Sequence, residues 1–168
     1  MINMKPLIFS AFLLLSISAF SQSSELLNQL PTTKAEFVAS EKQVINTIDW
    51  LENTPVDQNV EKRDAQKALL VAWITNSPTV TLNVNADILT FTKKNPELII
   101  YFMGGWTRYS LQNNYSTDVI LGSTAGIRSV IDVYKKGWFK KDKEMEKIIE
   151  MDQKGELDSW IKTKLANK

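Results

Sequence analysis

Apolar residues recur at steps of three and four residues along most of this chain, and this period limits the fold more than any other feature. The period is clearest between Lys34 and Asn53. The apolar residues of one helical face there are Phe37, Val38, Val44, Ile45, Ile48 and Leu51. Thr32 or Thr33 can cap this segment at its start. Pro55 ends it, because proline disfavours helical geometry in the residue before it. The pattern predicts a helix over residues 34–53.

Similar patterns, separated by capping and breaking residues, predict the helices of the rest of the chain. The expected helices run from Asp57 to about Thr75, over a short stretch after Asn85, from Pro96 to about Gln112 with Asn95 as the cap, from Ser116 or Thr117 to Tyr134 before Gly137, from Asp142 to about Lys154 before Gly155, and from Glu156 to Leu165. Residues 80–84 alternate like a strand but have no obvious partner, so we expect an extended connector. The sequence therefore predicts an all-α fold, an irregular bundle of about six to seven helices.

Small residues gather in the two helices that are expected to form a hairpin over residues 96–136. The residues predicted to pack the two helices together are Gly104, Gly105, Gly122, Ala125 and Gly126. A glycine within a helix costs about 1 kcal/mol relative to alanine, so close packing should compensate. A turn near Asn114 would pair Gly104 with Ala125 and Gly105 with Thr124. A tight helix contact is the favoured interpretation, and a ligand-binding glycine loop is the alternative, although the pattern of a phosphate loop is missing.

The first residues have the three parts of a secretory signal peptide. Lys5 gives a positive start, and an uncharged apolar run follows as far as Ile17. Ala19 and Ser21 then place small residues at the −3 and −1 positions of a cleavage site. This junction resembles the export signals of small secreted proteins of Gram-negative bacteria. We therefore expect cleavage near Ser21–Gln22 and a location in the periplasm or outside the cell.

Cleavage would divide the chain into a signal peptide (1–21), a flexible leader or one docked turn (22–33) and a single helical domain (34–168). The chain has no cysteine, so neither a lipid-carrying cysteine nor a disulfide is expected. No stable membrane span is expected after cleavage. Removal of Lys5 leaves 19 basic and 19 acidic side chains, a balance that predicts no general attraction to nucleic acid or to an anionic membrane.

The chain also has no histidine, and this limits its chemistry. Ser-His-Asp and Cys-His catalysis and the usual histidine or thiolate zinc sites cannot be built. Carboxylate acid–base catalysis and oxygen-ligand metals such as calcium remain, but no calcium-loop pattern is present. We therefore predict no catalytic residue, no metal site and no cofactor.

Aromatic and polar residues are most densely mixed in the middle of the expected hairpin. Trp106, Arg108 and Tyr109 follow the paired glycines, and Arg128 and Asp132 lie across the hairpin at a helical i, i+4 spacing. The functional interpretation is a pocket for an anionic or planar ligand. The plainer interpretation, which we favour, is a core tryptophan beside an ordinary Arg–Asp pair. Any ligand- or partner-binding site is expected at these residues.

A lysine cluster lies between the hairpin and the last helices, with members Lys135, Lys136, Lys140, Lys141 and Lys143. Because Asp142, Glu144 and Glu146 interleave with them, a solvated surface is favoured over a polyanion site. Trp138-Phe139 could anchor a partner or a membrane surface, but a staple that packs the last two helices is the favoured interpretation.

These patterns predict an exported, non-enzymatic helical module that binds an unknown protein or small ligand of the cell envelope. A carboxylate-dependent hydrolase of envelope polysaccharide is one alternative, and two acidic side chains about 5–10 Å apart in one cleft would favour it. A structural subunit of an envelope assembly is the other, and a large exposed apolar face would favour that role.

Overall fold

The structure is a computed structural model that describes residues 25–166. All regular secondary structure in this range is helical, which confirms the all-α prediction. The elements are α1 (Lys34–Asn53), α2 (Val60–Asn76), the short 3-10 helices η1 (Ala86–Ile88) and η2 (Thr90–Lys93), α3 (Leu98–Gln112), α4 (Val119–Tyr134), α5 (Lys143–Gln153) and α6 (Leu157–Ala166). The expected signal peptide, residues 1–21, lies outside the described residues.

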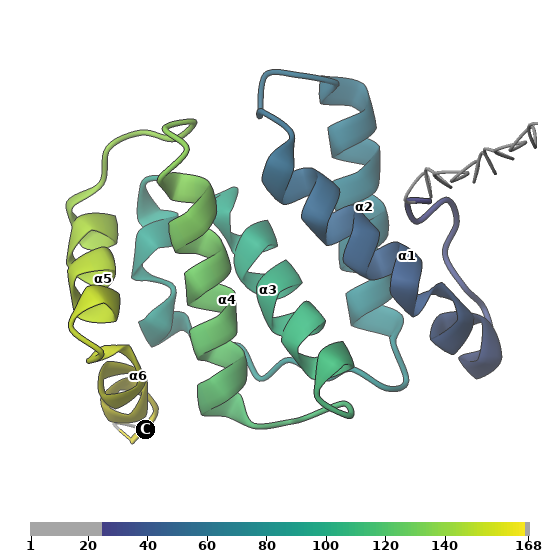
Figure 1. The fold of residues 1–168 in the computed structure, drawn as a ribbon. Coiled ribbons are helices and arrows are strands. Elements are labelled where there is room, and N and C mark those ends of the chain that lie inside the picture. Colours follow the sequence, from purple (N-terminus) through teal and green to yellow (C-terminus); the bar gives the residue numbers. More distant parts are fainter. Residues whose placement is uncertain (1–24, 167–168) are drawn as a thin grey trace, which may run out of the picture.

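An antiparallel hairpin of α3 and α4 forms the centre of the molecule (Figure 1). On one side α1 packs against α2 and α3, and on the other α5 and α6 lie against α4. The two 3-10 helices join this second side, where η1 contacts α6 and η2 contacts α5. The largest completely buried side chains, Trp73, Trp106, Phe91 and Phe102, come from both sides and from the hairpin. The surface of α5 and α6 that points away from this core forms one face of the molecule (Figure 1).

The ends of α1 follow from its local sequence. The Oγ1 atom of Thr33 accepts a hydrogen bond from the backbone N–H of Glu36 at 3.3 Å, and the Glu36 carboxylate accepts the backbone N–H of Thr33 at 3.0 Å. These reciprocal bonds form a capping box, which satisfies two N–H groups that the helix itself cannot pair. The helix ends at Asn53 because Thr54, before a proline, is extended. The predicted bounds of this helix are confirmed.

The predicted starts of α2 and α3 are wrong. α2 begins after Asn59 and not after Asp57, since Asn59 adopts a left-handed conformation with a φ of 51°. α3 begins at Leu98, two residues later than predicted, and Asn95 does not cap it. The Asn95 side chain instead donates to the carbonyl oxygen of Lys140 at 2.9 Å and accepts the N–H of Lys140 at 3.0 Å. Asn95 thus ties the start of α3 to the loop before α5.

The caps of α4 and α5 are both aspartates. Asp118 accepts two backbone N–H groups of the first turn of α4 at 2.9 Å, so the predicted caps Ser116 and Thr117 are wrong. Asp142 accepts the N–H of Glu144 at 3.0 Å and caps α5, as predicted.

Residues 25–33 are packed against α1 and α2. Leu27 is 1% exposed, its N–H donates to Thr47 Oγ1 at 2.9 Å, and its carbonyl oxygen accepts from Gln66 at 3.0 Å. Asn46 donates to the carbonyl oxygen of Glu25 at 3.0 Å. The described part of this segment is therefore docked on α1 and α2.

Gly105 and Gly126 let α3 and α4 approach closely. A Cβ atom on Gly105 would lie 2.8 Å from the carbonyl oxygen of Ala125 and 3.1 Å from the Cα atom of Gly126. A Cβ atom on Gly126 would lie 2.7 Å from the carbonyl oxygen of Phe102. These neighbours are backbone atoms, which cannot move aside as a flexible side chain can.

The other two hairpin glycines have different neighbours. Gly122 faces the indole ring of Trp106 so closely that a Cβ atom would overlap it. Gly104 does not face Ala125, because it lies against Ile48 of α1, whose Cγ2 atom would be 3.1 Å from an added Cβ. The predicted pairing of Gly104 with Ala125 is therefore wrong, and Gly104 serves the contact between α1 and α3.

Candidate functional site

Of the two aromatic residues that the sequence suggested for a binding site, Trp106 is part of the helix packing. Trp106 is completely buried, and its ring contacts that of Phe102 edge to face with centroids 5.8 Å apart. Its indole N–H has no hydrogen-bond acceptor among residues 25–166. Tyr109 lies on the same helix, partly exposed. Trp106 thus fills the core and offers no surface to a ligand.

Arg108 binds α1 rather than a ligand. Its guanidinium donates to both carboxylate oxygens of Glu52 at 2.7 and 3.0 Å and to Asp49 at 2.7 Å. Burial acts to lower the pKa of Arg108, but the hydrogen bonds and negative charges of Glu52 and Asp49 outweigh it and raise the pKa. Ser129 of α4 also donates to Glu52. This charged network therefore joins α1, α3 and α4.

Arg128 does not pair with Asp132 as the i, i+4 spacing suggested. The Arg128 Nε atom lies 3.0 Å from an Asp152 carboxylate oxygen on α5, and Asp132 is exposed on α4. The guanidinium of Arg108 is thus engaged by α1, and the Nε atom of the largely exposed Arg128 is engaged by α5, on opposite sides of the hairpin. The structure does not bring the five predicted residues together at one site.

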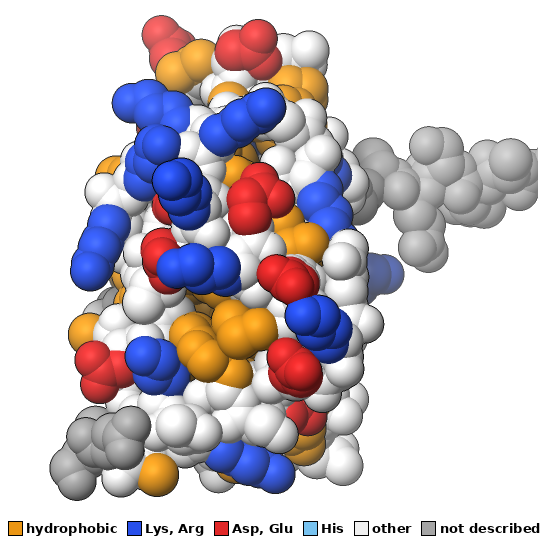
Figure 2. All heavy atoms as spheres, turned by 90° about the vertical axis from the view of Figure 1, so that its left-hand side faces the viewer, with side chains coloured by type: hydrophobic (Ala, Val, Ile, Leu, Met, Phe, Trp, Pro, Cys, Tyr) orange, Lys and Arg blue, Asp and Glu red, His pale blue; other side chains and the backbone are white. Residues whose placement is uncertain are grey.

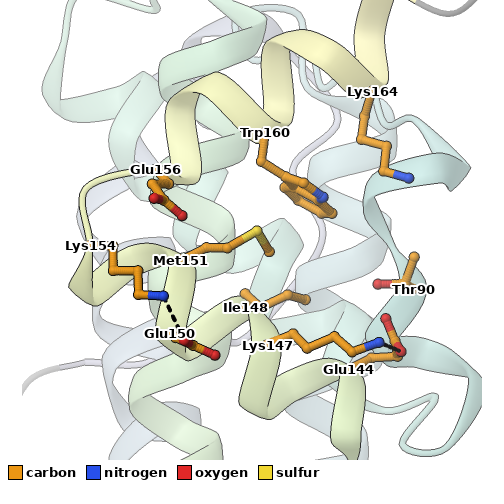
Figure 3. Close-up of a pocket in the computed structure, with 10 residues that line it drawn as sticks. All are labelled: Thr90, Glu144, Lys147, Ile148, Glu150, Met151, Lys154, Glu156, Trp160 and Lys164. Carbon is orange, nitrogen blue, oxygen red and sulfur yellow. Dashed lines mark hydrogen bonds and ion pairs between the residues drawn. The ribbon is translucent and has the colours of Figure 1, made fainter.

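A groove of about 350 Å3 lies instead between α5, α6 and η2 (Figure 3). We call it the α5–α6 groove. Its apolar residues are Ile148, Met151 and Trp160, and its charged residues are Glu144, Lys147, Glu150, Lys154, Glu156 and Lys164. Thr90 of η2 closes one end.

The apolar residues form the floor of the groove. Ile148 and Met151 are one helical turn apart on α5, and the indole ring of Trp160 extends from α6 toward both of them (Figure 3). Ile148 is buried, whereas Met151 and Trp160 keep part of their surface exposed. Figure 2 shows an apolar patch on this face with charged side chains around it. The floor is therefore an accessible apolar surface.

The charged residues form a rim in which two ion pairs are already made. The Lys147 ammonium lies 2.8 Å from Glu144, and the Lys154 ammonium lies 2.6 Å from Glu150. The hydrogen bonds and charges of these lysines lower the pKa of Glu144 and Glu150 and keep both as carboxylates. Lys164 has a different environment, with its Nζ atom 5.9 Å from the centre of the Trp160 ring.

This arrangement suits binding better than acid–base catalysis. A carboxylic acid that donates a proton near neutral pH needs a raised pKa, and the pKa values of Glu144 and Glu150 move the other way. Within residues 25–166 no group of three or more acidic side chains is placed to hold a metal ion.

The sequence predicted the helices α5 and α6 but did not indicate the groove between them. Trp160 belongs to the apolar side of α6, yet it lies next to the stripe of Leu157 and Ile161, which are buried against the core. This position beside the buried stripe, and not within it, was the feature of the sequence that could have indicated a partly exposed Trp160 ring. The position of α5 beside α6 was not visible in the sequence, because it depends on the turn at Gly155 and on packing against α4.

Neither the family models nor the curated proteins nor the solved structures contain a match to this chain. Among the helices of residues 25–166, none combines the length and the apolar character needed to cross a bilayer.

Proposed function

We propose that this protein is exported and acts in the periplasm or outside the cell as a non-enzymatic binding module. The charged start, apolar run and small-residue cleavage site of residues 1–21 support export. The α5–α6 groove supports binding, and its accessible floor of Met151 and Trp160 is the observation that carries the proposal. Apolar surface enclosed by a polar rim is typical of interaction sites.

The partner that fits this groove is a protein segment with one aliphatic or aromatic side chain between charged residues of both signs. The volume of about 350 Å3 is at the small end of the range for ligand pockets, so it suits an anchoring side chain better than a large cofactor. The rim has three lysines and three glutamates, so it has no net charge and matches a mixed-charge partner.

Two other roles have less support. A polysaccharide hydrolase is favoured by the three glutamates that line one groove, Glu144, Glu150 and Glu156, but it also needs a general acid, and the lowered pKa values of Glu144 and Glu150 oppose that role for these two. A structural subunit needs a large apolar face. The exposed large apolar residues of the described chain are dispersed over separate elements and are Leu30, Val38, Val60, Val84, Tyr115 and Leu121.

Selection of peptides from a displayed library tests the groove. We expect the selected peptides to carry an apolar anchor residue and to bind Met151→Gln or Trp160→Ala at least about tenfold more weakly than the unmodified protein, because a desolvated anchor contributes about 2 kcal/mol or more. Val38→Gln is the matched control, since Val38 is 43% exposed on the distant α1. Peptides whose affinity falls equally in the control, or in none of the variants, would refute the proposed site.

Fractionation tests export. We expect the protein in the periplasmic fraction or the medium with Gln22 as its first residue. Recovery of the chain from the cytoplasm with Met1 in place would contradict the proposal.

A further inference from the structure

Positive charge is concentrated in the loop between α4 and α5. Residues 135–143, which we call the basic loop, contain five lysines and one aspartate, a net charge of +4. The other described residues, 25–134 and 144–166, contain thirteen basic and eighteen acidic side chains, a net charge of −5. The numbers of basic and acidic residues nearly balance over the whole chain, but the basic loop is net positive and the rest of the described chain is net negative.

The acidic residues that interleave with these lysines in the sequence are engaged elsewhere in the structure. Asp142 is 8% exposed and caps α5. Glu144 pairs with Lys147 at 2.8 Å. Glu146 accepts a hydrogen bond from the hydroxyl of Tyr134 at 3.2 Å. These carboxylates keep their negative charge, but each contacts a group other than a lysine of the basic loop.

Four lysines of the basic loop present unpaired ammonium groups. Lys135, Lys140, Lys141 and Lys143 are exposed, and within residues 25–166 none of them has a carboxylate within ion-pair distance. Lys136 differs, since it donates to the carbonyl oxygen of Glu52 and to the side chain of Asn53. Figure 2 shows basic side chains gathered on the upper part of the α5–α6 face, at the level of this loop in Figure 1.

The backbone of the basic loop is held in place by contacts with α3 and its neighbours. The ring of Phe139 contacts that of Tyr101 edge to face at 5.9 Å between centroids, which makes Phe139 a packing staple. Asn95 holds the backbone of Lys140 by two hydrogen bonds, and the Tyr134 hydroxyl accepts the N–H of Asp142 at 2.8 Å.

Trp138 indicates which kind of polyanion fits this surface. It lies in the middle of the basic loop, is partly exposed, and has the Lys136 ammonium 5.2 Å from its ring centre. Tryptophan beside lysine is favoured at the boundary between lipid headgroups and acyl chains. A single-stranded nucleic acid could also stack a base on an exposed tryptophan, so competition by an oligonucleotide is the test that separates the two kinds of polyanion.

We propose that the basic loop is an interaction surface for anionic lipid headgroups and holds the protein reversibly at a membrane surface. The lysines contact the phosphates, and Trp138 enters the headgroup layer. The negative net charge of the rest of the molecule orients the basic loop toward the membrane. This surface is distinct from the α5–α6 groove.

Co-sedimentation of the exported protein with vesicles tests the proposal. We expect binding to vesicles with about 30% phosphatidylglycerol in phosphatidylcholine, no binding to pure phosphatidylcholine, and loss of binding between about 20 mM and about 500 mM NaCl. Lys140→Gln with Lys141→Gln should weaken binding about 25-fold, since each lysine near the surface contributes about fivefold. Lys34→Gln with Lys42→Gln is the matched control, because both residues are exposed on α1 and form no ion pair with a described residue.

Three results would overturn the proposal. These are equal weakening by the two double variants, equal binding to neutral vesicles, and displacement from the vesicles by an oligonucleotide at equal phosphate concentration. Met151→Gln should leave vesicle binding unchanged, so failure at the basic loop is distinguishable from failure at the α5–α6 groove.

Discussion

Gly126 has no room for a side chain where α4 crosses α3. An added Cβ atom would lie 2.7 Å from the carbonyl oxygen of Phe102, which is part of a helix and cannot turn away. We expect Gly126→Ala to lower the free energy of unfolding by about 2 kcal/mol, because overpacking of this kind costs about 1–3 kcal/mol. Urea denaturation measures the difference. Asp132→Ala, an exposed position on the same helix, should change stability by less than about 0.5 kcal/mol. An unaltered stability of Gly126→Ala would contradict the close crossing.

Single residues were predictable where their partners are close in sequence. The sequence indicated Thr32 or Thr33 as the cap of α1, and Thr33 caps it in a capping box with Glu36 within one turn. Arg128 has Asp132 four residues away but pairs with Asp152, 24 residues along the chain. Spacing within a helix shows which residues can meet, and the packing of α5 against α4 decides which residues do meet. For the same reason no sequence pattern gave Glu52 as the partner of Arg108, 56 residues away.

At the scale of elements, Arg63 of α2 holds three helices together. It is 2% exposed and donates to the carbonyl oxygens of Leu51 and Thr54 at the end of α1, at 3.2 and 2.6 Å, and to the Tyr101 hydroxyl of α3 at 2.6 Å. A cation is favourable at a helix C-terminus, and these carbonyl groups have no helical partner. Arg63 thus satisfies carbonyl groups at the end of α1 and holds α2 and α3 against that helix.

We expect Arg63→Met to lower the free energy of unfolding by about 3 kcal/mol, because buried acceptors lose a charged donor while the volume of the side chain is largely kept. Thermal or urea denaturation measures this. Lys62→Met is the control, since the adjacent Lys62 is exposed and contacts only the Trp50 ring, 5.0 Å from its ammonium, and its expected change is below about 1 kcal/mol. Arg63→Lys should retain part of the stability. Equal stability of Arg63→Met and the unmodified protein would show that α1 ends without this support.

Helices were easier to predict than the surfaces between them. The range of α1 was correct at both ends because a capping box and a proline act locally. The start of α2 was wrong because the left-handed Asn59 is a property of the turn, which composition does not reveal. The α5–α6 groove depends on the angle at which two short helices meet, so the sequence could supply Met151 and Trp160 as apolar residues but not as neighbours.

At the scale of the whole molecule, the binding surfaces and the N-terminal segment lie on opposite sides of the central hairpin. Residues 25–33 dock on the side of α1 and α2, whereas the α5–α6 groove and the basic loop belong to the side of α5 (Figure 1). The docked segment also links the expected cleavage point to stability, since Leu27 follows Gln22 by only five residues.

Cleavage after Ser21 keeps the docked segment, and cleavage further along would remove it. We expect a chain that begins at Gln22 to be about 3 kcal/mol more stable to urea than one that begins at Thr32. The shorter chain loses the buried Leu27 and its two backbone hydrogen bonds but keeps the Thr33 capping box. Within the longer chain, Leu27→Ala should cost about 2–4 kcal/mol, and Leu30→Ala, at a 39% exposed position, less than about 1 kcal/mol. Equal stability of the two chains would mean that residues 22–31 are dispensable for the fold. The position of cleavage would then have no effect on the stability of the protein.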